Sequence, residues 1–205
     1  MEQFNNVDEF IADLKAKLDE NPECAHHYYN LGVAHLSKGD WMEAERAFLE
    51  CVSNSQHFAE AYIQLGGICL QRGDLDGCLN YNKEAAQCRA GFAVPWGNIG
   101  FAHLQKGEIE KAVKALARAI KYDPKYIQAL ATMGSAMYMQ GEQDKCLEYC
   151  QQAVDQEPMF GPAYNNMALV WLDRGDLDKA RELLKKAQET GFDVPRPLLE
   201  QVGLA

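Results

Sequence analysis

One spacing of 34 residues recurs through most of the chain and limits its fold more than any other feature. A small residue marks every copy, at Gly32, Gly66, Gly100, Gly134 and Ala168. A glycine followed by an acidic residue also marks every copy, at Gly39-Asp40, Gly73-Asp74, Gly107-Glu108, Gly141-Glu142 and Gly175-Asp176. Because independent markers rarely stay in phase by chance over five copies, the sequence predicts an array of repeated structural units.

Each copy has the pattern of two short helices joined by a glycine turn. In the third copy, Trp96, Ile99 and Gly100 share one face of a first helix, and Leu116 lies on the apolar face of a second. Two helices approach to about 8–10 Å only where some of the contact residues are small. Gly107 between them can adopt the left-handed conformation that ends a helix. We therefore expect an all-α fold of antiparallel helix pairs.

The spacing of aromatic, small and apolar residues resembles the tetratricopeptide repeat. Counted from residues 25, 59, 93, 127 and 161, position 4 holds Tyr28, Tyr62, Trp96, Leu130 and Tyr164, and position 24 holds Phe48, Asn82, Leu116, Cys150 and Leu184. The resemblance covers residues 25 to about 194. It implies a right-handed superhelical α-solenoid of antiparallel helix pairs with a capping helix at both ends. Asn82 departs from the apolar pattern, so we expect the second repeat to be packed least tightly.

The expected domain organisation follows from this register. The five repeats would occupy residues 25–58, 59–92, 93–126, 127–160 and 161–194. Residues 1–24 would form an N-terminal capping helix with Phe10, Leu14 and Leu18 on its inner side. Residues 195–205 would form a short C-terminal capping helix, with Leu198 and Val202 in the register of an unfinished repeat. Repeat arrays need such caps because their terminal units otherwise expose an apolar face.

Charge and hydropathy disfavour several classes of function. The net charge is −10 and the pI is about 5.0, and the sequence shows no basic stripe, so we expect no nucleic-acid partner. No stretch of 18 apolar residues is present, so no membrane span is expected. The first ten residues lack the pattern of a secretory signal, which favours a cytoplasmic location.

The cysteines and histidines favour packing roles over metal binding or catalysis. Most cysteines fall at packing positions, namely Cys51, Cys69, Cys78, Cys146 and Cys150, and no CxxC motif occurs. Cys69 and Cys78 could face each other, which leaves an oxidised pair conceivable. The segment Cys24-Ala25-His26-His27 has the spacing of no common zinc site, so we expect neither a metal nor another cofactor. His35 and His103 are expected to be core histidines that each keep one hydrogen bond. Without a carboxylate or nucleophile beside them they make a poor case for catalysis, so no enzyme is predicted.

Function is expected on the face of each first helix that does not pack within its pair. In the family that the chain resembles, this face lines a concave groove that binds ligands. The residues at positions 5, 6 and 9 with side chains suited to a ligand contact are Tyr29, Asn30, Val33, Ile63, Gln64, Asn98, Phe101, Thr132, Asn165, Asn166 and Leu169. Position 6 is an amide in four of the five repeats, and a carboxamide both donates and accepts hydrogen bonds with a peptide backbone. The position-6 amides could also be solvated helix residues.

The expected partner is a protein. Chaperone-binding members of the family hold acidic C-termini with a clamp of lysines and arginines, and positions 2, 5, 6, 9 and 13 here contain neither. We therefore expect an adaptor or co-chaperone that binds a neutral or apolar segment, either extended or as an amphipathic helix. The alternative is an assembly scaffold that self-associates into a homo-oligomer.

Overall fold

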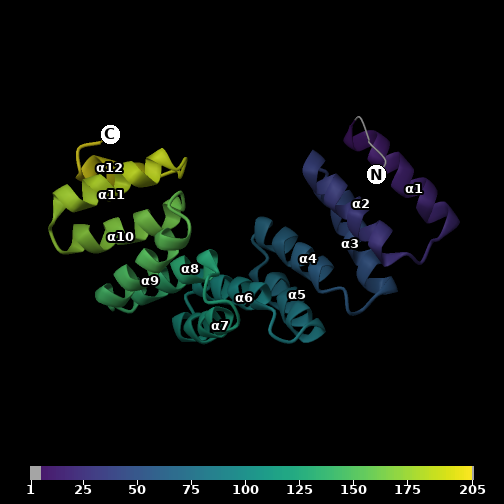
Figure 1. The fold of residues 1–205 in the computed structure, drawn as a ribbon, viewed down its shortest axis with the longest axis horizontal. Coiled ribbons are helices and arrows are strands. Elements are labelled where there is room, and N and C mark those ends of the chain that lie inside the picture. The colour runs from purple at the N-terminus through teal and green to yellow at the C-terminus, as the bar shows by residue number, and fades with distance from the viewer. Residues whose placement is uncertain (1–5, 205) are drawn as a thin grey trace. The chain divides into compact units, whose positions relative to one another are not determined.

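The computed structural model describes residues 6–204, so residues 1–5 and 205 of the two predicted caps lie outside the described part (Figure 1). The described residues form helices and no strand. The helices are α1 (Val7–Glu20), α2 (Ala25–Lys38), α3 (Trp41–Asn54), α4 (Ala59–Gln71), α5 (Leu75–Cys88), α6 (Ala93–Gln105), α7 (Ile109–Tyr122), α8 (Ile127–Met139), α9 (Gln143–Gln156), α10 (Gly161–Asp173), α11 (Leu177–Glu189) and α12 (Arg196–Gln201). The all-α solenoid fold predicted from the sequence is confirmed.

A left-handed glycine separates the two helices of every pair. Gly39, Gly73, Gly107, Gly141 and Gly175 have φ angles of 72–79°. At the first of these turns, the Gly39 amide donates to the Leu36 carbonyl, and the Asp40 amide donates to the His35 carbonyl. These two bonds satisfy carbonyls that the end of a helix leaves without partners. A side chain at any of the five glycines would be strained in this conformation.

Within each pair, a small residue on the first helix faces a larger side chain on the second. A Cβ atom placed on Gly100 would lie 2.5 Å from Leu116 Cγ, and one placed on Gly32 would lie 2.5 Å from Phe48 Cε1. The glycines at the same position of the second and fourth repeats meet Asn82 and Cys150 in the same way. In these four pairs the absence of a Cβ is therefore what allows the two helices to pack closely, and the fifth pair has the small residue Ala168 at this position.

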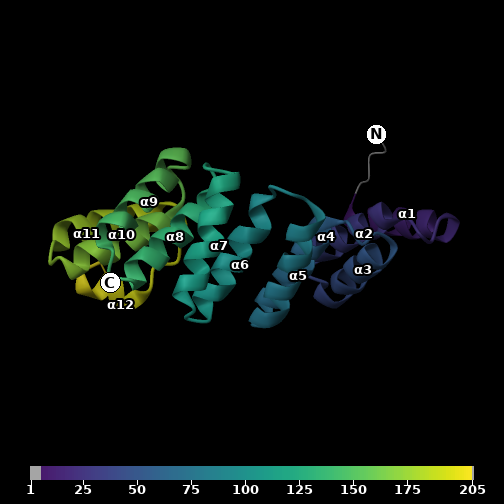
Figure 2. The same cartoon turned by 90° about the horizontal axis from the view of Figure 1, so that it is seen from below.

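The chain divides into two compact units, Met1–Pro95 and Trp96–Ala205. In the first unit, α1 packs against α2, and the pairs α2–α3 and α4–α5 pack through the contact of α3 with α4 (Figure 2). Leu14 and Leu18 of α1 are buried, as expected, and Ile11 joins them. The N-terminal helix thus covers the apolar face of the first repeat.

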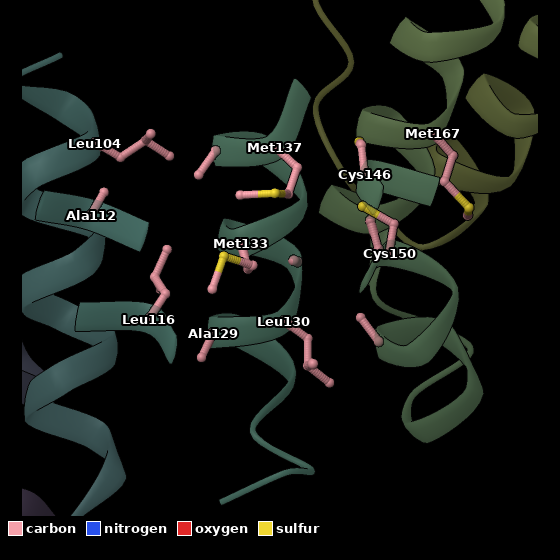
Figure 3. Packing of buried hydrophobic residues seen from close by; sticks show 14 of the residues in the cluster. Leu104, Ala112, Leu116, Ala129, Leu130, Met133, Met137, Cys146, Cys150 and Met167 are labelled. Atoms are coloured by element: carbon pink, nitrogen blue, oxygen red, sulfur yellow. The ribbon is translucent and has the colours of Figure 1, made fainter. Parts of the chain in front are cut away.

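The second unit has a continuous core that runs through α7, α8, α9 and α10. In Figure 3, Met133 and Met137 of α8 point toward Leu104 and Leu116. On the other side of α8, Leu130 packs in the same apolar cluster as the residues of α9 and α10. At the C-terminal end, Val202 is buried against α11 and closes the core.

Asn82, the one polar residue at position 24, is fully buried. Its Nδ2 donates to the Cys78 carbonyl over 2.9 Å, one turn earlier on α5. Tyr81 beside it packs near Tyr62, with ring centroids 6.4 Å apart. The side-chain amide is therefore hydrogen-bonded inside the core, which avoids the cost of burying an unpaired polar group.

All seven cysteines are free thiols, and the five at packing positions are buried as expected. Desolvation raises the pKa of the Cys51 thiol to about 12 and that of the Cys78 thiol to about 11. The described helices include none that is long and apolar enough to span a membrane. Between residues 6 and 204, no three histidine, cysteine or acidic side chains gather in a group that could hold a metal ion.

The burial of the thiols predicts their order of reactivity. Thiolates are the reactive species, so iodoacetamide at pH 8 should modify the half-buried Cys24 and Cys88 well before Cys51 and Cys78. Peptide mapping by mass spectrometry checks the order, and the protein unfolded in guanidinium serves as the control in which every cysteine reacts. Equal rates for Cys24 and Cys51 in the folded protein would contradict this account.

The same shifts predict how stability changes at alkaline pH. An unfolded thiol with a pKa of 9.0 loses its proton before the folded Cys51 thiol, whose pKa is about 12. The folded state therefore binds more protons in this range, and the free energy of unfolding should fall as the pH rises from 9 toward 12. Guanidinium titrations of the protein and of a Cys51→Ala, Cys78→Ala variant separate this effect from the titration of tyrosines and lysines. The difference between the two proteins should depend on pH, and a constant difference would contradict the prediction.

Candidate functional site

The first helices of the third, fourth and fifth predicted repeats line an open groove in the second unit. It has a volume of about 680 Å³ and is bordered by α6, α8 and α10. Five of the predicted ligand-binding residues lie along it, namely Asn98, Phe101, Thr132, Asn165 and Asn166. The structure therefore brings together side chains that are 68 residues apart in the sequence, from Asn98 to Asn166.

The groove has an aromatic wall and no charged residue in its lining. Phe101 of α6 is 36% exposed and points outward from the core. Tyr126 and Phe160, which precede α8 and α10, complete the wall together with Phe192. Burial raises the pKa of the Tyr126 phenol above its ordinary value, so the ring is neutral across the physiological range.

Sequence reasoning missed these aromatic residues, although a signal for them is present. Position 34, just before each first helix, holds an aromatic residue in four consecutive repeats, at Phe58, Phe92, Tyr126 and Phe160. Glycine makes room for one of these rings, since a Cβ atom on Gly97 would lie 2.5 Å from Tyr126 Cε1. The wall of the groove thus depends on side chains that no single helix presents.

Asn166 and Thr132, both among the predicted binding residues, already have structural partners. Asn166 Nδ2 donates to the Ala131 carbonyl over 3.1 Å and to Ser135 Oγ over 2.7 Å, which ties α10 to α8. Thr132 Oγ1 donates to the Gln128 carbonyl over 2.6 Å within α8. The Asn166 bonds help to hold neighbouring repeats together, whereas the Thr132 bond stays within one helix.

Asn165 differs from Asn166 beside it. Its Oδ1 is buried and has no hydrogen-bond partner among residues 6–204. An unsatisfied buried acceptor costs about 1–3 kcal/mol. Asn165 is one of the residues that line the groove.

The remaining predicted binding residues lie outside this groove lining. Leu169 is half-buried on α10 and does not line the groove. In the first unit, the Tyr29 ring stacks on Phe58 at 5.0 Å between centroids, so it belongs to the packing of that unit. The others in the first unit are partly or largely exposed, and they are Asn30, Val33, Ile63 and Gln64.

The prediction that the two histidines have no carboxylate beside them is wrong. His35 Nδ1 lies 3.3 Å from Asp40 Oδ2, and His103 Nδ1 lies 2.6 Å from Glu108 Oε2. The glycine turn folds the acidic residue back over the last turn of the first helix, which linear spacing does not reveal. The hydrogen bond from Lys111 and, as a smaller contribution, the one from His103 hold the pKa of the Glu108 carboxyl below its ordinary value. Each contact links the end of one helix to the start of the next.

Comparison with known proteins gives consistent results. A family model described as TPR repeat matches residues 98–141. Two models described as Tetratricopeptide repeat match residues 4–56 and 34–91, and residues 163–189. No curated protein sequence matches the chain significantly.

Solved structures share the fold. The crystal structure of MamA is 26% identical, with a TM-score of 0.65 over 78% of this chain and 94% of that chain. YrrB, described as a TPR protein with an unusual peptide-binding site, is 18% identical. The TM-score is 0.68, and the match covers 94% of this chain and 98% of YrrB. TTC0263, described as a thermophilic TPR protein in Thermus thermophilus, is 21% identical. The TM-score is 0.69, and the match covers 88% of this chain and 97% of TTC0263. The last two similarities support the fold alone.

The contrast between the two neighbouring asparagines predicts different effects on stability. Asn166→Ala removes two inter-helix hydrogen bonds and should lower the free energy of unfolding by about 1–3 kcal/mol. Asn165→Ala removes an unsatisfied acceptor and should leave stability unchanged or slightly higher. Guanidinium titrations followed by circular dichroism compare the variants, and equal losses would show that the two amides have the same role.

Proposed function

Because this chain belongs to the tetratricopeptide repeat family, whose fold is a protein-interaction module, we propose that it is an adaptor whose second-unit groove binds an uncharged segment of a partner protein. The observation that carries the proposal is the lining of the groove, which is open and aromatic and has no charged side chain. A concave surface with a few polar groups among apolar ones is typical of a binding site.

The size and polarity of the groove define the class of ligand. A volume of about 680 Å³ lies within the range of sites that enclose a compact ligand or a few side chains. Phe101, Tyr126 and Phe160 offer flat apolar surfaces for an aromatic or large aliphatic side chain. A charged side chain in the same place would lose its hydration without gaining an ionic partner.

The polar groups of the groove favour a peptide backbone over an apolar molecule. Asn165 has an acceptor without a partner, and a backbone N–H is the donor that every non-proline residue of a peptide supplies. An extended segment would satisfy this acceptor while its side chains meet the aromatic wall. The neutral lining also disfavours the acidic chaperone tails that a basic clamp would hold, so the proposed role is that of an adaptor in the cytoplasm rather than a receptor for such tails.

Selection from a library of displayed random peptides tests the proposal. The bound peptides should be uncharged and should share an aromatic or large aliphatic residue. Phe101→Ala should weaken binding of a selected peptide by about tenfold, because truncation of an aromatic anchor typically costs more than 1 kcal/mol. Leu177→Ala is the matched control, since Leu177 is 47% exposed on α11 outside the groove.

Two results would contradict the proposal. One is the recovery of only charged peptides, and the other is equal affinity of the selected peptides for the Phe101→Ala variant and the Leu177→Ala control. Light scattering over a range of concentrations distinguishes the alternative of self-association. An oligomer that Phe101→Ala converts to a monomer would show that the groove is filled by another copy of this chain.

A further inference from the structure

α7 presents a row of basic side chains that packing does not explain. Lys111, Lys114, Arg118 and Lys121 recur at intervals of three, four and three residues, which places them on one face of the helix. All four are exposed, while the opposite face of α7 is buried in the core of the second unit. We call these four residues the α7 basic face. It corrects the expectation that the chain has no basic stripe, because basic residues three and four positions apart do not stand out as a consecutive run.

The repeats provide an internal comparison for this surface. The four residues occupy positions 19, 22, 26 and 29 of the third repeat, where their net charge is +4. At the same positions, α3 carries Glu43, Arg46, Glu50 and a serine, a net charge of −1. The corresponding net charge is −1 on α5, −1 on α9 and zero on α11. A solvated helix face in this fold therefore does not require a positive charge.

Several of these cations have no carboxylate partner. Lys114 and Lys121 form no ion pair with any residue between positions 6 and 204. The Arg118 guanidinium lies 3.8 Å from the centroid of the Trp96 ring, and its Nε donates to Tyr122 Oη over 3.0 Å. Lys111 is paired with Glu108 over 3.1 Å. The face thus offers two unpaired ammonium groups beside a guanidinium that its neighbours hold in place.

The charge distribution of the chain limits the partner. Residues 1–95 contain 7 basic and 15 acidic residues, which gives a net charge of −8. Residues 96–205 contain 13 basic and 15 acidic residues, which gives a net charge of −2 and a total of −10 for the chain. A large polyanion such as duplex DNA or an anionic membrane would meet this overall negative charge. The α7 basic face is only one helix wide, with Glu110 and Asp123 near its two ends. This geometry favours a narrow acidic segment.

We propose that the α7 basic face docks a short acidic segment of a partner protein, on a surface separate from the peptide groove. From Lys111 to Lys121 the helix rises about 15 Å, which an extended peptide of about five residues spans. Carboxylates at every second position of such a segment would lie on one side and face the row of cations. Binding of the acidic segment does not involve the groove, because no residue of the α7 basic face lines the groove.

A labelled peptide of about eight alternating glutamate and serine residues is the probe, and the same peptide with glutamine in place of glutamate is its neutral counterpart. Fluorescence anisotropy measures the affinity at NaCl concentrations from about 50 to 300 mM, where screening of exposed charges increases. The acidic peptide should bind at least about tenfold more tightly at the lowest salt, and the preference should disappear at the highest.

The decisive variant is Lys114→Glu with Lys121→Glu, which should lower the affinity for the acidic peptide at least about tenfold. The matched control is Lys83→Glu with Lys185→Glu. These lysines are also exposed, on α5 and α11, and the control makes the same change in net charge. The control should retain binding within about twofold, as should Phe101→Ala, which separates this surface from the groove. If circular dichroism shows that the double reversal unfolds the protein, Lys114→Gln with Lys121→Gln replaces it.

Several outcomes would overturn the proposal. Equal affinity for the acidic and neutral peptides, or equal losses in the α7 variant and its control, would show that these lysines are only solvated charges. Tighter binding of duplex DNA or of vesicles containing phosphatidylserine, lost in the α7 variant, would show that the partner is not a protein segment. Salt-sensitive self-association that the α7 variant abolishes would show that the acidic segment belongs to a second copy of this chain.

Discussion

The contact between a glycine, which has no Cβ atom, and a larger side chain determines how closely the two helices approach in the first four pairs. Gly100 against Leu116 and Gly32 against Phe48 show the contact in the third and first repeats. Burial of a leucine or phenylalanine in this position contributes about 1.5–3 kcal/mol, and it is available only because the facing backbone has no side chain. The pair then buries one face of each first helix and leaves another face outside it. The candidate binding groove lies on that other face.

The face outside the pair is divided between structure and proposed function. Asn166 donates to α8 and so helps to position neighbouring repeats. Asn165, one residue earlier, has a buried acceptor that no residue in the described part of the chain satisfies. Adjacent asparagines on one helix therefore differ in what they contribute, and the groove depends on both. The aromatic residues before α8 and α10 provide its apolar wall.

The features that the sequence predicted well are local or repeated. The left-handed conformation of Gly107 and the burial of Leu14 in the N-terminal cap follow from helix periodicity and turn chemistry. Features that depend on how neighbouring elements approach were missed. The contact of His103 with Glu108 requires the fold of the turn, and the bridge from Asn166 to Ser135 requires the spacing between repeats. The α7 basic face can be found from helical spacing in the sequence. A search for consecutive basic residues does not find it, because its members lie three or four positions apart.

The central claim is that the groove of the second unit binds the uncharged segment of the partner protein. The most direct test is a titration of the ¹⁵N-labelled protein with a selected uncharged peptide, followed by NMR of backbone and asparagine side-chain amides. The account predicts that the signals of Asn98, Phe101, Thr132 and Asn165 shift most, while those of Asn30 and of the second helices stay in place. Shifts concentrated in the first unit, or along α9 and α11, would contradict it.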